Sequence, residues 1–120
     1  MILRNAEEEP DLDEVLDALD DPAARAIIQE ARQPMSAGEI AEACDIPLST
    51  TYRKLELLSD ATLLREETEL RLSGRHRSQY RVAFERVGVE LSKQGTLDLD
   101  ISRPPADQFA AMWSEVRREA

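Results

Sequence analysis

The sequence is poor in several residue types: among its 120 residues are one cysteine, one histidine, one tryptophan and two lysines. The lone cysteine excludes a disulfide within the chain, as expected in a reducing compartment. No apolar run approaches the roughly 18 residues of a membrane span, and no charged-then-apolar leader opens the chain. With 42% hydrophobic and 33% charged residues, the sequence predicts one folded, soluble domain in the cytoplasm.

Patterns that carry catalysis are missing as well. The sequence has no glycine-rich phosphate loop, no Ser-His-Asp arrangement and no metal-ligand spacing. Cys44 lies on an apolar stripe, which favours a buried structural thiol; a redox sensor or an intermolecular disulfide are the alternatives. We therefore expect no enzymatic activity, no metal site and no cofactor.

Charge is strongly one-sided, with 25 Asp and Glu against 15 Lys and Arg and a net charge of −10. Acidic surfaces keep proteins soluble in high salt by holding hydrated cations, so we expect a halophilic protein that binds potassium or other cations. An ordinary acidic protein from a GC-rich genome is the alternative. Residues 1–46 carry 3 basic and 13 acidic side chains, whereas residues 47–86 carry 8 basic and 6 acidic ones. The middle segment is the positive exception.

Apolar residues at helical spacing predict two short helices near the start of the chain. The first has its stripe at Leu12, Val15, Leu16 and Leu19, and the second at Ala24, Ile27, Ile28 and Ala31. Asp21-Pro22 separates the two, because proline suits a first helical position behind an aspartate cap. Residues 1–10, with three consecutive glutamates, are expected to be a flexible acidic lead-in.

A second pair of helices follows, joined by a tight turn. Ser36 and Glu39 form a capping box that opens a helix with an apolar stripe at Ala37, Ile40, Ala41 and Cys44. After the turn at Asp45-Ile46-Pro47, a helix over Pro47–Ser59 is predicted to bury Thr51, Leu55 and Leu58. Its other faces present Ser49, Thr50, Tyr52, Arg53 and Lys54, which suit base edges and phosphates. A solvated face with a serine-threonine cap would give the same pattern.

The spacing of apolar residues changes to two after Leu63, which predicts a hairpin. Leu70 and Leu72 are expected to face one side of its first strand, and Tyr80, Val82 and Phe84 the same side of its second. The second strand is expected to continue through Val87, Val89 and Leu91. Gly74-Arg75-His76-Arg77 is the predicted turn, and four arginines but no acid lie between positions 71 and 81. Such a tip can follow a DNA backbone or enter a minor groove, although Arg71 and Arg81 are expected to pair with nearby glutamates across the strands.

These motifs together resemble the ArsR-type winged-helix regulators, in the variant abundant in haloarchaea. The resemblance covers about residues 11–92 and is carried by the Ser36–Leu58 helix-turn-helix, by Leu48-Ser-Thr-Thr-Tyr52-Arg-Lys-Leu55 and by the run Gly74–Tyr80. It implies an α+β winged helix-turn-helix, mostly helical, with a two-stranded β-hairpin wing. It also implies a homodimeric transcription factor, usually a repressor, with Pro47–Ser59 as recognition helix and Arg75, His76 and Arg77 at the wing. The family's metal sensors use paired cysteines or added ligands, which this chain does not offer.

The sequence thus predicts a regulator that binds double-stranded DNA through the recognition helix and the wing, with Ser36 contacting the DNA backbone. Additional N- and C-terminal helices are the dimerisation candidates, through Leu12, Val15, Leu16 and Leu19 and through Phe109, Met112, Trp113 and Val116. Packing within the monomer is the alternative. The expected order is a winged domain at 11–92, a linker at 93–105 and the C-terminal helix at 106–120.

Two further questions stay open at the level of sequence. An acidic winged helix can also act as a protein-interaction module, or bind DNA without sequence preference as a chromatin-like protein. The carboxylates of Glu56, Glu66, Glu67 and Glu69 are expected to trap cations between protein and phosphates, unless they serve solubility alone.

Overall fold

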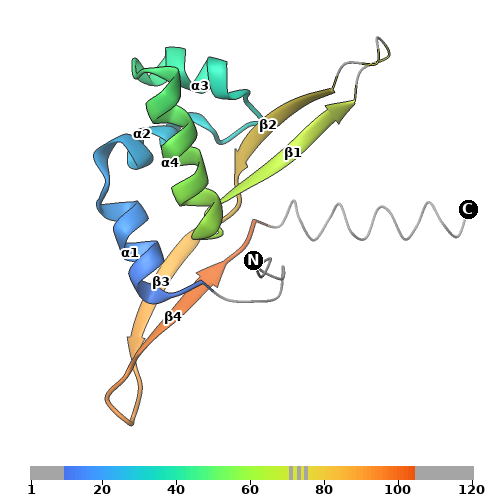
Figure 1. The fold of residues 1–120 in the computed structure, drawn as a ribbon. Coiled ribbons are helices and arrows are strands. Elements are labelled where there is room, and N and C mark those ends of the chain that lie inside the picture. The colour runs from blue at the N-terminus through green and yellow to red at the C-terminus, as the bar shows by residue number, and fades with distance from the viewer. Residues whose placement is uncertain (1–9, 71, 73, 75, 105–120) are drawn as a thin grey trace, which may run out of the picture. The chain divides into compact units, whose positions relative to one another are not determined.

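The computed structural model describes residues 10–70, 72, 74 and 76–104, which fall into two compact units on either side of the Val82–Ala83 bond. The first unit contains α1 (Leu12–Asp20), α2 (Pro22–Glu30), α3 (Ala37–Cys44), α4 (Leu48–Asp60), β1 (Leu64–Leu70) and β2 (His76–Val82). The second contains β3 (Arg86–Leu91) and β4 (Leu97–Ser102). The four helices and the β1–β2 hairpin form a winged helix-turn-helix of the α+β class, as predicted (Figure 1). Within the described residues, none of the helices is long and apolar enough to cross a membrane.

Side-chain caps fix the starts of two helices, where the sequence predicted them. The Asp21 carboxylate accepts hydrogen bonds from the amides of Ala23 and Ala24, at 2.9 and 3.1 Å, with Pro22 in the first turn. At α3, the Ser36 hydroxyl accepts from the Glu39 amide while the Glu39 carboxylate accepts from the Ser36 amide. Each cap satisfies amides that a helix leaves without partners.

The core of the first unit lies between the helices. Val15, Ile27, Ile40 and Leu58 are completely buried and come from four different helices. α4 buries Thr51, Leu55 and Leu58, as its spacing predicted. The Thr51 hydroxyl donates to the Pro47 carbonyl at 3.0 Å, so this buried polar group has a partner within its own helix.

The hairpin wing is joined to the helices by backbone hydrogen bonds that the sequence did not predict. β1 and β2 pair antiparallel, and Met35 adds an isolated bridge on β2 opposite Tyr80. The Met35 amide donates to the Tyr80 carbonyl at 3.0 Å, and the Tyr80 amide donates to the Met35 carbonyl at 2.7 Å. The Val82 amide also donates to the Ala31 carbonyl at 2.8 Å. The segment between α2 and α3 therefore holds the wing strand in place.

The turn of the wing differs from the prediction. β1 ends at Leu70 and β2 begins at His76, so His76 and Arg77 belong to β2 and not to the turn. Leu72 was expected to face one side of a strand; it is instead fully exposed in the turn, where Gly74 has a φ of +84°. The prediction was wrong because the alternation of apolar residues extends to Leu72, whereas the turn at Gly74 places this residue outside the β1–β2 ladder.

The second unit also departs from the expected strand pattern. The second wing strand was expected to run on through Val87 to Leu91, but it ends at Val82 and a separate strand begins at Arg86. Residues 93–105 were expected to be a linker without strands, yet Leu97–Ser102 form β4, antiparallel to β3. The alternation of leucine and aspartate in this stretch is a strand signal that the neighbouring turn residues concealed. The predicted lead-in at 1–10, apart from Pro10, and the predicted helix at 106–120 lie outside the described residues.

Asp21 has two structural roles, because it both caps α2 and forms an ion pair with Lys54 on α4. The Lys54 hydrogen bond, followed by the backbone amides, lowers the Asp21 pKa below its ordinary value of 3.8. The carboxylate therefore stabilises the fold above that pH, and the stabilisation is lost as pH falls through the folded-state pKa. We expect Asp21→Ala to lower the free energy of unfolding by about 1–2 kcal/mol in urea denaturation at pH 7.

Asp21→Asn keeps a capping oxygen but removes the charge, so it measures the contribution of the ion pair alone. Its loss in the free energy of unfolding should be smaller than that of Asp21→Ala, and it should shrink as the solution is acidified below pH 4. Asp20→Ala, at the exposed neighbouring position, is the matched control. Equal losses from Asp21→Ala and Asp20→Ala would contradict the structural role of Asp21.

Candidate nucleic-acid interface

The first turns of α4 present a polar surface to solvent. Because Thr51, Leu55 and Leu58 face the core, the side chains between them point outward. Ser49 and Arg53 are exposed, and Thr50 is half-buried. The N-cap residue of α4 is Pro47, which provides no side-chain cap, so the first amides of the helix remain available to a hydrogen-bond acceptor. The predicted recognition residues Ser49, Thr50 and Arg53 therefore lie together at one helix end.

Lys54 was predicted to contact DNA, but it has a partner within the chain. Its ammonium group binds the Asp21 carboxylate, and the two side chains keep 24% and 19% of their exposure. Since Asp21 also caps α2, the pair ties the start of α2 to the middle of α4. No local sequence pattern signals this contact, because the two residues are 33 positions apart.

The predicted DNA-backbone residue Ser36 and the predicted wing residue Arg77 contact each other. The Arg77 guanidinium donates to the Ser36 hydroxyl at 2.6 Å and forms an ion pair with Glu39. Hydrogen bonds from Ser36, and to a lesser extent the charge of Arg77, lower the pKa of Glu39. The side chains of Arg77 and Glu39 remain 36% and 53% exposed. This cluster, which we call the α3–wing cluster (Ser36, Glu39 and Arg77), keeps its arginine at the protein surface.

Of the remaining wing residues that the structure describes, His76 is exposed and Arg81 forms an ion pair. His76 is exposed on β2, and Arg75 lies outside the described residues. Arg81 forms an ion pair with Glu67 at 3.0 Å across the hairpin, which confirms the predicted cross-strand pairing for that arginine. Of the described wing arginines, Arg77 is thus the one placed nearer the turn.

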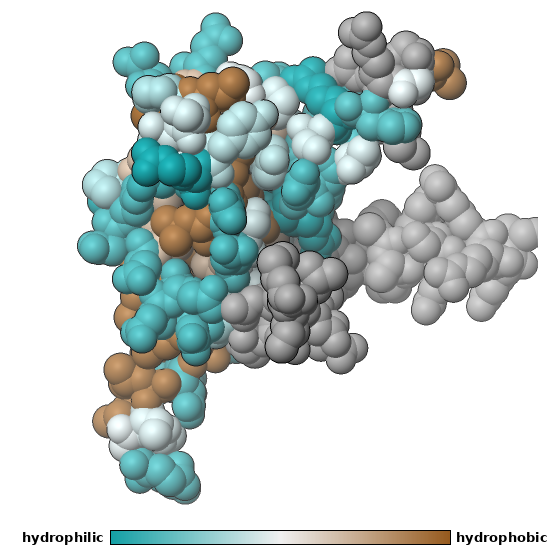
Figure 2. Space-filling model, in the orientation of Figure 1, coloured by the Kyte–Doolittle hydropathy of each residue, from teal (hydrophilic) through white to brown (hydrophobic). Residues whose placement is uncertain are grey.

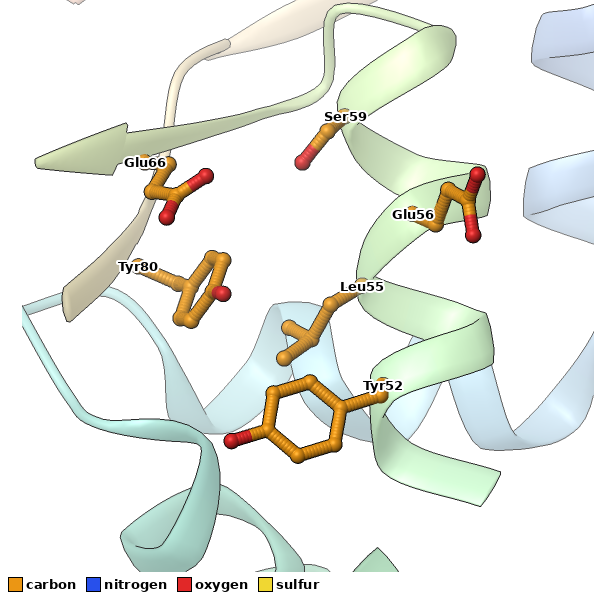
Figure 3. A pocket seen from close by; sticks show the side chains of 6 residues that line it. All are labelled: Tyr52, Leu55, Glu56, Ser59, Glu66 and Tyr80. Carbon is orange, nitrogen blue, oxygen red and sulfur yellow. The ribbon is translucent and has the colours of Figure 1, made fainter. Parts of the chain in front are cut away.

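A cavity of about 310 Å³ lies between α4 and the wing (Figure 3). Tyr52, Leu55, Glu56 and Ser59 line it from α4, and Glu66 and Tyr80 line it from the hairpin. Tyr52 was predicted as a DNA contact; it is 53% exposed and stands at the edge of this cavity. Burial, with the charge of Glu66 second, raises the pKa of Tyr80. The tyrosine is therefore neutral at physiological pH.

The predicted dimerisation residues on α1 are placed differently from one another. Val15 is completely buried within the chain, so it packs in the monomer and cannot contact a partner. Leu16 is 45% exposed, and Leu12 and Leu19 are half-buried. The residues Phe109, Met112, Trp113 and Val116 lie outside the described residues. Only part of the expected stripe is thus accessible from outside.

Cys44 is half-buried on α3. Burial, and secondarily the charge of Glu30, raises the pKa of its thiol, which disfavours the reactive thiolate. In the described part of the chain, no group of three or more histidine, cysteine, aspartate or glutamate side chains is arranged to hold a metal ion.

The helical part of this surface is similar to a known protein family. Residues 19–67 match the family described as "Helix-turn-helix domain", a range that runs from the end of α1 into β1. No curated protein matches the sequence. The solved structure of a "possible transcriptional regulator" from Methanosarcina mazei Go1 is similar over 68% of this chain and 73% of that one, with 15% identity and a TM-score of 0.46. A likeness this distant carries no argument about function; the helix-turn-helix match supports a DNA-binding regulator.

Proposed function

We propose that this protein is a sequence-specific, DNA-binding transcriptional regulator of the ArsR-like haloarchaeal type, which acts as a homodimeric repressor in a high-salt cytoplasm. The observation that carries the proposal is the exposed start of α4, with Ser49 and Arg53 on it, in a helix-turn-helix domain. This surface belongs to residues 47–86, the positively charged segment of an acidic chain. A helix presented in this way fits a major groove, and the adjacent hairpin fits the neighbouring backbone or minor groove.

The proposed contacts divide into base reading and backbone binding. Arg53 has a planar fork of donors that suits guanine, and Ser49 and Thr50 suit phosphates near the helix start. In the α3–wing cluster, a DNA phosphate would compete with Glu39 for Arg77, because both are oxyanions. His76 and Arg75 complete the proposed wing contact. Lys54 is assigned to positioning α4 through Asp21.

The proposed DNA binding would have to occur at high salt concentration. Counterion release contributes little to the binding free energy in concentrated salt, because the released ions enter a solution that already has a high ion concentration. Base hydrogen bonds and shape fit must then supply the affinity. We propose that acidic side chains beside the interface take up cations on binding; Glu56 and Glu66 are exposed there, whereas Glu67 is already paired with Arg81.

An electrophoretic shift with genomic DNA fragments, performed from about 0.5 to 3 M potassium chloride, tests the function and its salt dependence together. We expect selective retention of some fragments and only a shallow fall in affinity with salt, because cation uptake offsets cation release. A steep fall would contradict cation uptake. Binding of all fragments alike would indicate a chromatin-like protein, and no binding would favour a protein-interaction module.

Replacing Arg53 tests base reading. Arg53→Ala should weaken binding to a selected DNA site by about 1–3 kcal/mol and relax the sequence preference, because a bidentate base contact is lost. The combination Arg75→Ala with Arg77→Ala should weaken all sequences more evenly, since it removes backbone contacts. Affinities for selected and scrambled sites measure both effects, and an equal loss of preference in the two variants would contradict the division of roles.

The homodimer needs an interface, and the hairpin of the second unit offers one. Its register pairs Val87 with Ile101, Val89 with Leu99 and Leu91 with Leu97, so one face carries three successive aliphatic pairs. The other face pairs Glu90 with Asp98. Leu91, Leu97 and Val89 are 71%, 57% and 45% exposed, and Figure 2 shows hydrophobic side chains gathered on this hairpin.

A second copy of the chain is the proposed cover for this face. A two-stranded hairpin is at best marginally stable alone, and two identical aliphatic faces can pack against each other around a two-fold axis. The like-charged acidic faces would then point away from each other into solvent. The homodimer is proposed to bind an inverted repeat, with its two recognition helices about 34 Å apart.

Leu91→Lys tests this interface with little cost to the monomer, because the leucine is already 71% exposed. We expect the dimer dissociation constant, measured by sedimentation equilibrium, to rise about tenfold or more, since each dimer would bury two unpaired charges. Glu90→Lys introduces the same side chain on the opposite face and should leave the dimer intact. Equal effects of the two substitutions, or a monomeric wild-type protein, would overturn the assignment.

A further inference from the structure

The cavity between α4 and the wing combines two aromatic rings with a carboxylate. Tyr52 and Glu56 on α4 are separated by one helical turn, and Ser59 follows on the same stripe. Across the cavity, Glu66 and Tyr80 are direct partners in the β1–β2 register. Figure 3 shows Tyr80 and the Glu66 carboxylate extending from the hairpin toward α4, and Tyr52 and Leu55 extending from α4 on the same side.

The charge in the cavity is negative and lacks a protein partner. Among the described residues, no ion pair is recorded for Glu66 or Glu56, although Glu67, next along the strand, is paired with Arg81. Glu66 points into the cavity, whereas the Glu56 carboxylate turns away from it at the rim (Figure 3). The charge of Glu66 also contributes to the raised pKa of Tyr80. The lining therefore lacks a cation.

Tyrosine rings beside a carboxylate are groups that recognise organic cations. A quaternary ammonium or protonated amine is attracted to a tyrosine face by the ring quadrupole and to the carboxylate by its charge. A volume of about 310 Å³ is at the lower end for small-molecule sites, so the ligand is small.

We propose that the cavity between α4 and the wing binds a small organic ammonium cation through Tyr52, Tyr80 and Glu66. Since Tyr52 also belongs to the outer surface of α4, an occupied cavity changes the surface offered to DNA. The two ligands are then linked, and each alters the affinity for the other by the same factor. Binding of the cation is independent of the proposed function, whereas its effect on DNA rests on that function.

Tetraethylammonium chloride is the probe, added to the full chain at constant total chloride with sodium chloride as the balance. The variant Tyr52→Phe keeps both rings but leaves Tyr80 as the single tyrosine of the chain, so the absorbance change on tyrosine ionisation reports Tyr80 alone. A bound cation stabilises the phenolate, so we expect the Tyr80 pKa to fall as the probe saturates. The same titration gives the dissociation constant without DNA.

Glu66→Gln should weaken this binding about three- to tenfold, since it removes the charge and keeps the shape of the side chain. Glu42→Gln removes an equal charge from an exposed position on α3 and should leave the affinity unchanged. Tyr52→Leu removes one ring and should weaken binding about two- to fivefold, as followed by calorimetry.

Three results would overturn the proposal: no shift of the Tyr80 pKa with the probe, equal effects of Glu66→Gln and Glu42→Gln, or an equal shift when potassium chloride replaces the probe. The last result would identify an inorganic cation site. If the probe binds but the protein retains no DNA fragment, the cavity assignment stands and the proposed function fails. If the probe binds and DNA affinity is unchanged, the linkage alone is wrong.

Discussion

The packing of Thr51, Leu55 and Leu58 against the other helices sets the orientation of α4, and the rest of the candidate surface depends on it. A helix that buries this stripe must turn Ser49 and Arg53 outward. The ion pair between Lys54 and Asp21 adds a second constraint, because it joins α4 to the start of α2. Core packing therefore sets the direction in which the proposed recognition surface faces.

Electrostatics at this surface combine two opposite requirements. The chain carries a net charge of −10, whereas the proposed DNA contact would require positive charge at the surface. Two of the wing arginines that the structure describes pair with acids: Arg77 with Glu39 and Arg81 with Glu67. In the proposed complex, a DNA phosphate would have to displace the Glu39 carboxylate to reach Arg77. Such exchange favours well-placed phosphates over a general electrostatic attraction.

Local signals in the sequence predicted the helical framework, and nonlocal contacts limited the prediction of the site. Asp21 and Ser36 predict the starts of α2 and α3, because capping depends on residues only two or three positions away. By contrast, the partners of Lys54 and Arg77 lie 33 and about 40 positions away and depend on how the elements pack. The strand at Leu97–Ser102 was missed for another reason, since neighbouring turn residues outweighed a short alternation.

The bridge between Met35 and Tyr80 bears on how such a protein can diversify. Its two hydrogen bonds join main-chain atoms, so they make little demand on the side chains around them. Mutations can then alter the chemistry of the hairpin tip while its attachment to the helical body is inherited unchanged. New specificities become accessible by substitution in one ribbon, without rebuilding the scaffold that carries it.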